Sequence, residues 1–509
     1  MLKKLFVPRT LLLLIPVLMQ LAIFIMLVLR FSEYFGYFYV TSITISVIVV
    51  VLILNSRSNP AYKIAWIIPI MLFPIFGGVF YLLVGRHKLS KRNKKRMQLI
   101  EIKTKEALET HHHVLGKIKS IRRGAALQAS YIQNYAYFPP YEDSFTEYLP
   151  IGEIKFQRLK EALENAQHFI FLEYYIIEEG KMWNSILDIL KLRVAEGVDV
   201  RIIYDDVGCI FTLPRDYHLR LEEMGIQCCV FNPLTPILSL KGNTRDHRKI
   251  AVIDGHTGFT GGINLADEYI NEIDKYGHWK DSSIMVKGKA VWNLTVMFLS
   301  MWDYLRGIDE DFNEFRNYSQ DDREVEQVGF VQPFADSPLD NESVGQTVYL
   351  NLISKASKSI YITTPYLIID YEMINALTTA AKNGVDVRII TPHHGDRWFV
   401  HSVTRSYYRQ LLEGGVKIYE YTPGFIHSKT FVVDDDYGIV GTINMDYRSL
   451  YLHFECGVWL FKTESVVHMK DDFIDTLSMC QEITLEQASN LPWYRVLGRL
   501  LLRIFAPLL

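Results

Sequence analysis

The chain of 509 residues carries 54 Lys and Arg against 57 Asp and Glu, a formal net charge of −3 at pH 7. That length exceeds one domain and suits a membrane segment followed by two domains of about 150 to 200 residues each. A nearly neutral chain has no overall basic field of the kind that nucleic-acid-binding proteins carry. Its five cysteines show neither zinc-ligand spacing nor a secreted disulfide framework, which indicates a reducing compartment.

Two apolar runs near the amino terminus are long enough to cross a bilayer. Residues 11–29 and 34–54 contain no charged side chain. A secretory signal peptide is the alternative for the first run, but no small-residue cleavage site separates it from the second. We therefore expect a membrane-anchored protein whose first part, 1–88, contains two to three hydrophobic helices.

A third apolar run, 64–85, is interrupted by two prolines and two glycines between residues 69 and 78. Basic residues precede the first run and cluster again at 86–96, and positive charge stays on the cytoplasmic side. Both ends then lie inside, so one of the three runs does not span. We expect the broken third run to be re-entrant or interfacial, although the sequence leaves a full crossing open. The basic cluster suits either anionic headgroups or a solvated linker.

Residues 89–150 predict a basic and polar connector. Within it, His111, His112 and His113 invite a metal interpretation, but no cluster of further ligands lies near them in the sequence. A solvated helix face is the better interpretation of these three residues. Their role stays unassigned at this point.

One short pattern occurs twice in the remaining chain with identical spacing. A Lys follows a His by two residues, an Asp follows that Lys by five, and an Asn follows that Asp by ten. A longer match supports a duplicated domain, because 197–203 and 384–390 both read Gly-Val-Asp-Val-Arg-Ile-Ile. The two copies of the short pattern are His247, Lys249, Asp254 and Asn264, and His427, Lys429, Asp434 and Asn444.

Each half alternates strand, helix, strand and helix before the strand that carries the motif. This alternation predicts an α/β fold of two pseudo-symmetric halves, each an α/β/α sandwich. We expect five parts: a membrane segment (1–88), a connector (89–150), a first half (151–320), a second half (321–485) and a basic carboxyl-terminal helix (486–509).

The motif residues suit phosphate chemistry. In a strand, a His and a Lys two residues apart point the same way, and the β-branched residues after each Lys favour a strand. The following Gly-rich turn brings backbone N–H groups and an amide to the same spot. Such a collection suits a phosphate, with His as nucleophile or proton carrier. The alternative, an edge His beside an unrelated surface Lys, weakens when two copies match.

Two acids follow the motifs at similar distances. Asp281 lies 34 residues after His247, and Glu455 lies 28 residues after His427. We expect each carboxylate to accept the Nδ1 proton of the His in its own half, which fixes the tautomer of that His. A surface acid at a strand end is the alternative. The acid pair at 205–206 is interpreted as a turn or a salt bridge, because no third metal ligand accompanies it.

The end of the chain has a basic amphipathic pattern. Arg495, Arg499 and Arg503 recur at i, i+4 and i+8, and apolar residues fill much of the remaining circumference. Such a helix is typical of a segment that lies on an anionic lipid surface. A terminal helix docked on the protein core is the alternative.

These features resemble a known family. The paired His-x-Lys-x4-Asp signature is similar to that of the phospholipase D superfamily, and nearly the whole chain resembles its bacterial cardiolipin synthases. The closer resemblance rests on Pro-Ile-Phe-Gly-Gly at 74–78, Leu-Val-Gly-Arg at 83–86, Asn-Met-Asp-Tyr-Arg-Ser at 444–449 and the Arg/Leu-rich tail. Three residues depart from the family pattern. Gly262 and Thr442 stand where Ser is common, and His453 stands where Asn is common.

The resemblance implies that both halves build one active site without a cofactor or a metal ion. It implies a phosphohistidine on His247 and an acid/base role for His427, although the symmetric sequence does not choose between them. Asp281 and Glu455 would orient the two rings. Four other signature residues would hold phosphoryl oxygens: Lys249, Lys429, Asn264 and Asn444. The remaining two would pin the motif locally: Asp254 and Asp434.

The resemblance also implies an activity, in which two phosphatidylglycerol molecules give cardiolipin and glycerol. The expected partners are these lipids in the bilayer, an anionic membrane surface and a second copy of the chain, but no nucleic acid. The expected location is the bacterial cytoplasmic membrane, with several crossings and the catalytic halves inside. Three alternatives stay open: a phospholipase D-type hydrolase or phosphatidylserine synthase with the same site, a nuclease of the superfamily, and a non-catalytic membrane scaffold.

Overall fold

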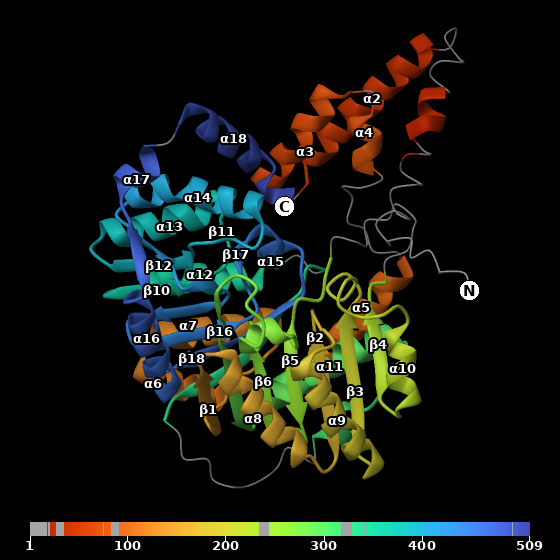
Figure 1. Ribbon diagram of the computed structural model, residues 1–509, viewed down its shortest axis with the longest axis vertical. Helices are drawn as coiled ribbons and strands as arrows, with labels where there is room; N and C mark the ends of the chain where they lie inside the picture. Colours follow the sequence, from red (N-terminus) through yellow and green to blue (C-terminus); the bar gives the residue numbers. More distant parts are fainter. Residues whose placement is uncertain are drawn as a thin grey trace.

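The computed structural model describes residues 18, 21–26, 35–56, 58–74, 76–82, 91–233, 244–316, 328–339, 342–490 and 492–508. Most of the first apolar run and residues 86–90 of the basic cluster lie outside these residues. Figure 1 shows two α/β units side by side, with a helical arm extending from them. The predicted α/β fold with two similar halves is confirmed.

The first half is built on a seven-stranded sheet in the order β1-β8-β6-β5-β2-β3-β4. Strands β2, β3 and β4 run parallel, and the other neighbours are antiparallel. Alternate residues of β2 point to opposite faces of the sheet. One set packs with helices α8 and α9 and the other set packs with α11, so helices cover both faces. The elements are β1 Ser144–Leu149, α8 Gly152–Glu164, β2 Phe169–Tyr174, α9 Lys181–Ala195, β3 Asp199–Asp205, α10 Tyr217–Glu223, β4 Gln227–Phe231, β5 Lys249–Ile253, β6 Thr257–Gly261, β7 His278–Lys280, β8 Ser283–Gly288 and α11 Val291–Arg306.

The second half repeats this plan on an eight-stranded sheet, β19-β13-β12-β10-β15-β16-β18-β9. Helix α12 lies on one face, where Tyr349 stacks on Phe431, and α16 lies on the other, where Phe473 stacks on Tyr361. The elements are β9 Phe330–Asp336, α12 Val344–Lys355, β10 Ser359–Thr363, β11 Leu367–Ile368, α13 Tyr371–Lys382, β12 Asp386–Pro392, α14 Trp398–Glu413, β13 Lys417–Tyr421, β14 Gly424–Ile426, β15 Thr430–Val433, β16 Tyr437–Gly441, β17 Met445–Asp446, α15 Tyr447–Tyr451, β18 Glu455–Phe461, α16 Glu464–Leu477, β19 Cys480–Ile483 and α17 Leu485–Ser489.

The connector is helical and contacts both halves. It contains α5 Lys91–Ala107, α6 His112–Ile121 and α7 Arg123–Tyr131. In the first half, Lys103 Nζ lies 2.8 Å from Asp303 Oδ2 of α11. In the second half, Gln128 Nε2 donates to the Val348 carbonyl of α12 at 3.1 Å. The expected connector range also includes β1, which the sequence did not identify as the edge strand that pairs with β8.

The helical arm consists of α2 Phe35–Leu54, α3 Pro60–Leu72 and α4 Gly77–Phe80. Within the part of the chain that the structure describes, α2 is the one helix long and apolar enough to cross a membrane, over Gly36–Leu54. The third apolar run is not one continuous helix, because it breaks between α3 and α4. Gly78 packs on α2 so closely that a Cβ would lie 2.5 Å from Ser46 Oγ.

An amide of the arm is hydrogen-bonded to the second half. Asn59 caps α3 by accepting from Ala61 N, and its Nδ2 donates to Asp370 Oδ2 at 3.1 Å and to the Tyr451 hydroxyl at 3.0 Å. Tyr451 in turn donates to Asp370 Oδ2 at 2.6 Å. This network holds the beginning of α3 against the second half.

The carboxyl-terminal helix α18, Trp493–Ile504, follows the predicted basic amphipathic pattern. It contacts α14 and α3, yet none of its residues is fully buried. Trp493 is 77% exposed, and Leu500 and Leu501 are each 53% exposed. Much of its apolar surface is therefore exposed among the described residues, while Leu502 packs against the core, so the helix is docked only in part.

Candidate active site

The motif strands place each His and Lys at the edge shared by the two halves. His247 and His427 lie just before β5 and β15, outside the strands themselves, and both imidazoles are buried. Lys249 Nζ donates to the His247 carbonyl at 2.5 Å, and Lys429 Nζ donates to the His427 carbonyl. Each ammonium is thereby fixed beside the backbone of its own His.

The signature aspartates pin the motif strands from behind. Asp254 and Asp434 have positive φ values of 51° and 54° in the turn after the strand, a conformation that Asp tolerates. Asp254 accepts from the backbone N–H groups of residues 167–169 at 2.7 to 2.9 Å. Asp434 accepts from those of residues 357–359 at 2.7 to 3.0 Å. These local contacts agree with the expected pinning role.

The two orienting acids are crossed between the halves. Glu455 Oε1 lies 2.9 Å from His247 Nδ1, and Asp281 Oδ2 lies 2.6 Å from His427 Nδ1. The expected pairing of each acid with the His of its own half is therefore wrong. The backbone explains the crossing: His247 N donates to the Phe454 carbonyl at 2.9 Å, and β7 pairs with β14 immediately before the other His. Each half thus supplies the acid for the imidazole of its partner half.

Two residues that depart from the family pattern fit these acids. A Cβ on Gly262 would lie 2.0 Å from Asp281 Oδ1, so only Gly leaves room for that carboxylate. Thr442, at the corresponding position of the second half, donates its hydroxyl proton to Glu455 Oε2. Asp281, the shorter acid, therefore packs against Gly262, and Glu455, the longer acid, accepts a hydrogen bond from the Thr442 hydroxyl.

Burial and positive charge set the protonation of the cluster. The pKa of His247 lies well below its usual value because of burial, with further lowering by Lys249, Lys429 and His427. The pKa of His427 is also lowered by burial and by Lys429, but Asp281 opposes the change. These mutual effects place both imidazoles and both ammonium groups in one cluster.

The charged groups around the imidazoles are shifted as well. Burial lowers the pKa of Lys249 to about 7 and that of Lys429 to about 8. Burial raises the pKa of Glu455 to about 8, against the effect of Lys249 and of the Thr442 hydroxyl. A phosphate that enters this site would raise the pKa of both lysines and so favour their charged forms.

The two candidate phosphate-binding amides have different surroundings. Asn264 Oδ1 accepts from Ile176 N at 3.0 Å, and its Nδ2 donates to the Tyr269 hydroxyl at 2.7 Å. The Tyr269 ring lies 5.7 Å from the His427 ring. Asn444 Oδ1 is buried and has no hydrogen-bond partner among the described residues. Asn264 therefore has a positioning contact through Tyr269, whereas Asn444 retains an unused acceptor.

His453 is a residue of the site that the motif did not reveal. Its ring lies 5.8 Å from that of His247, and neither of its buried ring nitrogens has a hydrogen-bond partner within the described part of the chain. Among those residues, His247, His453 and Glu455 form the one group whose potential ligand atoms lie within 4.8 Å of one another. Because His247 and Thr442 engage both Glu455 oxygens, we interpret the group as a hydrogen-bonded cluster.

The remaining sequence candidates have structural partners. Asp205 accepts from the backbone N–H groups of Val207 and Gly208 and lies 3.2 Å from Arg245 Nη1, so a turn and a salt bridge explain it. His111 Nδ1 lies 3.1 Å from the Pro140 carbonyl, whereas the next two histidines are exposed. Neither group belongs to the imidazole cluster.

Two repeated α/β halves that meet at a pair of His-Lys motifs define the phospholipase D-like class of proteins. Residues 159–302 and 349–477 match the family described as cardiolipin synthase, phospholipase D-like domain, and residues 43–86 match a phospholipase D-nuclease N-terminal family. The chain belongs to this cardiolipin synthase family.

Individual relatives agree with this assignment. The chain is 35% identical to a cardiolipin synthase of Halalkalibacterium halodurans, over 92% of this chain and 93% of the relative. It is 43% identical to an uncharacterized protein of Streptococcus mutans, over 90% of this chain and 99% of the relative. A phosphatidylserine synthase from Haemophilus influenzae has the same fold, with a TM-score of 0.57 at 16% identity, over 75% of this chain and 98% of that structure.

Proposed function

We propose that the protein is a cardiolipin synthase that transfers a phosphatidyl group from one phosphatidylglycerol to another and releases glycerol. The observation that carries this proposal is the crossed pair of buried imidazoles, each with Nδ1 held by a carboxylate of the opposite half. This arrangement leaves Nε2 of each ring for a phosphodiester between them. Membership of the cardiolipin synthase family supports the choice of lipid.

In the first step, His247 Nε2 attacks phosphorus and the bond from phosphorus to the glycerol oxygen breaks. His427 Nε2 gives its proton to that oxygen, and glycerol leaves. In the second step, His427 takes a proton from the hydroxyl of a second phosphatidylglycerol, whose oxygen attacks phosphorus and breaks the phosphorus–nitrogen bond. Lys249, Lys429 and the Nδ2 group of Asn444 donate to the phosphoryl oxygens as charge develops on them.

The assignment of the two histidines follows from their surroundings. A nucleophile must be neutral, and the pKa of His247 is lowered further by three neighbouring cations or imidazoles. A general acid must hold a proton, and Asp281 acts to raise the pKa of His427. We therefore assign attack to His247 and proton transfer to His427.

Membrane attachment suits lipid substrates. A helix long enough to span begins at Gly36, and the basic amphipathic α18 leaves its apolar residues exposed. Both substrates are confined to the bilayer, so a tethered site meets them at high effective concentration. We further propose several membrane crossings, with the catalytic halves on the cytoplasmic side, from the distribution of basic residues around the apolar runs.

Acceptor choice separates this proposal from hydrolysis or phosphatidylserine synthesis at the same site. Purified protein in vesicles that contain labelled phosphatidylglycerol should form cardiolipin and glycerol without nucleotide. Added serine should not become part of a lipid product. Phosphatidic acid as the main product would identify a hydrolase, and labelled phosphatidylserine would identify the other synthase; either result would reject the proposal.

A further inference from the structure

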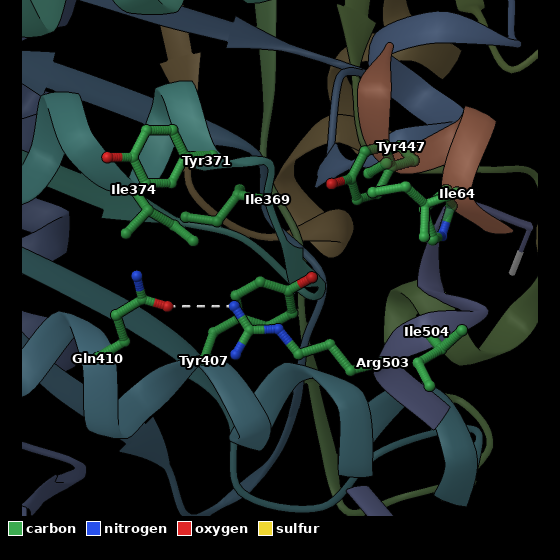
Figure 2. A pocket seen from close by; sticks show the side chains of 11 residues that line it. Ile64, Ile369, Tyr371, Ile374, Tyr407, Gln410, Tyr447, Arg503 and Ile504 are labelled. Atoms are coloured by element: carbon green, nitrogen blue, oxygen red, sulfur yellow. Dashed lines mark hydrogen bonds between the residues drawn. The ribbon is translucent and has the colours of Figure 1, made fainter. Parts of the chain in front are cut away.

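A pocket of about 250 Å³ lies where the helical arm and α18 meet the second half. Its walls come from α3 and α18 and from α13, α14 and α15 of the second half (Figure 2). Ile64, Ile374 and Ile504 give it apolar walls. Sites for a whole small ligand usually enclose about 300 to 1,000 Å³, so this pocket suits a segment of one flexible chain. None of the motif residues lines it.

One cation borders this apolar pocket. The Arg503 guanidinium lies 4.2 Å from the centre of the Tyr407 ring and donates to Gln410 Oε1 at 3.1 Å (Figure 2). Within the described residues, no Asp or Glu forms an ion pair with Arg503. An arginine has five N–H donors, so several remain for a phosphate, which the planar group can bind through two parallel hydrogen bonds. The pocket thus combines an apolar cavity with an available phosphate-binding group.

The position of the pocket indicates which molecules reach it. Helix α3 begins six residues after α2 ends, and α2 is the candidate membrane span. Helix α18 carries exposed apolar residues and Arg495, which is suited to an anionic surface. Molecules that combine an acyl chain with a phosphate are concentrated at such a surface.

We propose that this pocket binds an anionic phospholipid as a second lipid site, separate from the histidine cluster. One acyl chain lies between Ile64, Ile374 and Ile504, and the phosphate binds Arg503. The proposal goes beyond the transferase function and does not depend on it, because it rests on the pocket, the charge and the membrane-facing helices alone.

Photolabelling in nanodiscs tests this site. The full-length protein carries His247→Ala so that it cannot turn over lipid, and the probe is a phosphatidylglycerol with a photoreactive group near the end of one acyl chain. We expect labelled peptides from α13, α14 and α18. Arg503→Gln should lower their labelling about tenfold, the effect of one lost charged hydrogen-bonding group. Arg409→Gln is the control, because it removes an exposed charge from α14 outside the pocket, and it should leave labelling unchanged.

A second variant guards against a change in folding. Ile64 is 55% exposed, so Ile64→Trp reduces the pocket volume without disturbing the core and should also lower labelling. Labelling of α2 peptides measures membrane insertion in every variant and should stay constant. The proposal fails if Arg503→Gln and Ile64→Trp are labelled like the parent protein. It also fails if a phosphatidylcholine probe labels these helices as strongly as the phosphatidylglycerol probe. Because the parent is catalytically inactive, neither result bears on the proposed transfer reaction.

Discussion

At the scale of single residues, each histidine depends on a carboxylate that belongs to the other half. Glu455 contacts His247 and Asp281 contacts His427, both through Nδ1. A carboxylate in this position fixes the ring and stabilises the charge that forms on it during reaction. The two acids therefore support different steps, because the two histidines have different proposed roles.

Conservative variants separate these two roles. Glu455→Gln and Asp281→Asn should each lower turnover of phosphatidylglycerol by about 10² to 10⁴-fold. With a phosphodiester that has a p-nitrophenol leaving group, no general acid is needed, so Asp281→Asn should still release nitrophenol in a rapid first turnover. Glu455→Gln should not, since its nucleophile is impaired. Rapid-quench measurement of that burst distinguishes them, and the opposite pattern would exchange the proposed roles of His247 and His427.

The pKa shifts predict a narrow pH optimum. The carboxylate form of Glu455 is present above its pKa of about 8, and the ammonium form of Lys249 is present below its pKa of about 7. The rate at low phosphatidylglycerol content should therefore pass through a maximum at about pH 7.5, with the rising limb below about pH 7 and the falling limb above about pH 8. Glu455→Gln should remove the rising limb. A profile that is flat from pH 6 to 9 would contradict this assignment.

Among the site residues, those within the repeated pattern could be predicted from the sequence. The His, Lys, Asp and Asn positions follow from spacing, and period-two alternation places each His with its Lys. The partner of each acid could not be predicted, because the crossing depends on contacts such as that between His247 N and the Phe454 carbonyl, which join the two halves. Tyr269 lies outside the repeat and was found only from its distance to His427. His453 was noted in the sequence as a departure from the family pattern, and its distance to His247 shows that it lies at the site.

At the scale of elements, each motif strand is fixed by the turn that follows it. Burial acts to raise the pKa of Asp434, but hydrogen bonds from Ser359, Ser357 and Lys358 outweigh burial and hold this pKa below its usual value. The carboxylate thus joins the end of β15 to the beginning of β10. Asp254 joins β5 to β2 in the same way.

Removal of this carboxylate should destabilise the second half. Asp434→Ala leaves backbone N–H groups without an acceptor and puts Ala in a left-handed conformation, at a cost of about 2 to 4 kcal/mol. Asp434→Asn keeps one acceptor oxygen and tolerates the conformation, so it should lose less. Thermal unfolding in detergent, followed by circular dichroism, measures both. Equal stability of Asp434→Ala and the parent protein would refute the pinning role.

The order of elements was predictable where the sequence alternates clearly between strand and helix patterns. The strand, helix and strand expected ahead of the first motif are found as β2, α9 and β3. By contrast, β1 lies in the range assigned to the connector, because its membership of the sheet depends on a partner strand, β8, more than a hundred residues later. The interruption of the third apolar run was visible from its prolines and glycines, and the chain does break there.

At the scale of the whole molecule, the proposed orientation in the membrane depends on the distribution of basic residues around the apolar runs. The proposed cytoplasmic location of the catalytic halves places α18 inside the cell. Gly498 on α18 has no neighbouring atom within 4 Å of an added Cβ, so Gly498→Cys introduces an accessible thiol. This variant should react with a membrane-impermeant maleimide only after the cells are opened. The parent protein, treated under both conditions, is the control. Reaction in intact cells would show the reverse orientation.

The most direct test of the account is the fate of phosphatidylglycerol at a site made by both halves. Purified protein should convert phosphatidylglycerol alone, in the presence of a chelator, into equal amounts of cardiolipin and glycerol, and an acid quench should trap a phosphatidyl adduct on His247. His247→Ala and His427→Ala should each abolish cardiolipin formation. A reaction that requires an added divalent metal ion, or cardiolipin formation that survives both substitutions, would contradict the proposed mechanism.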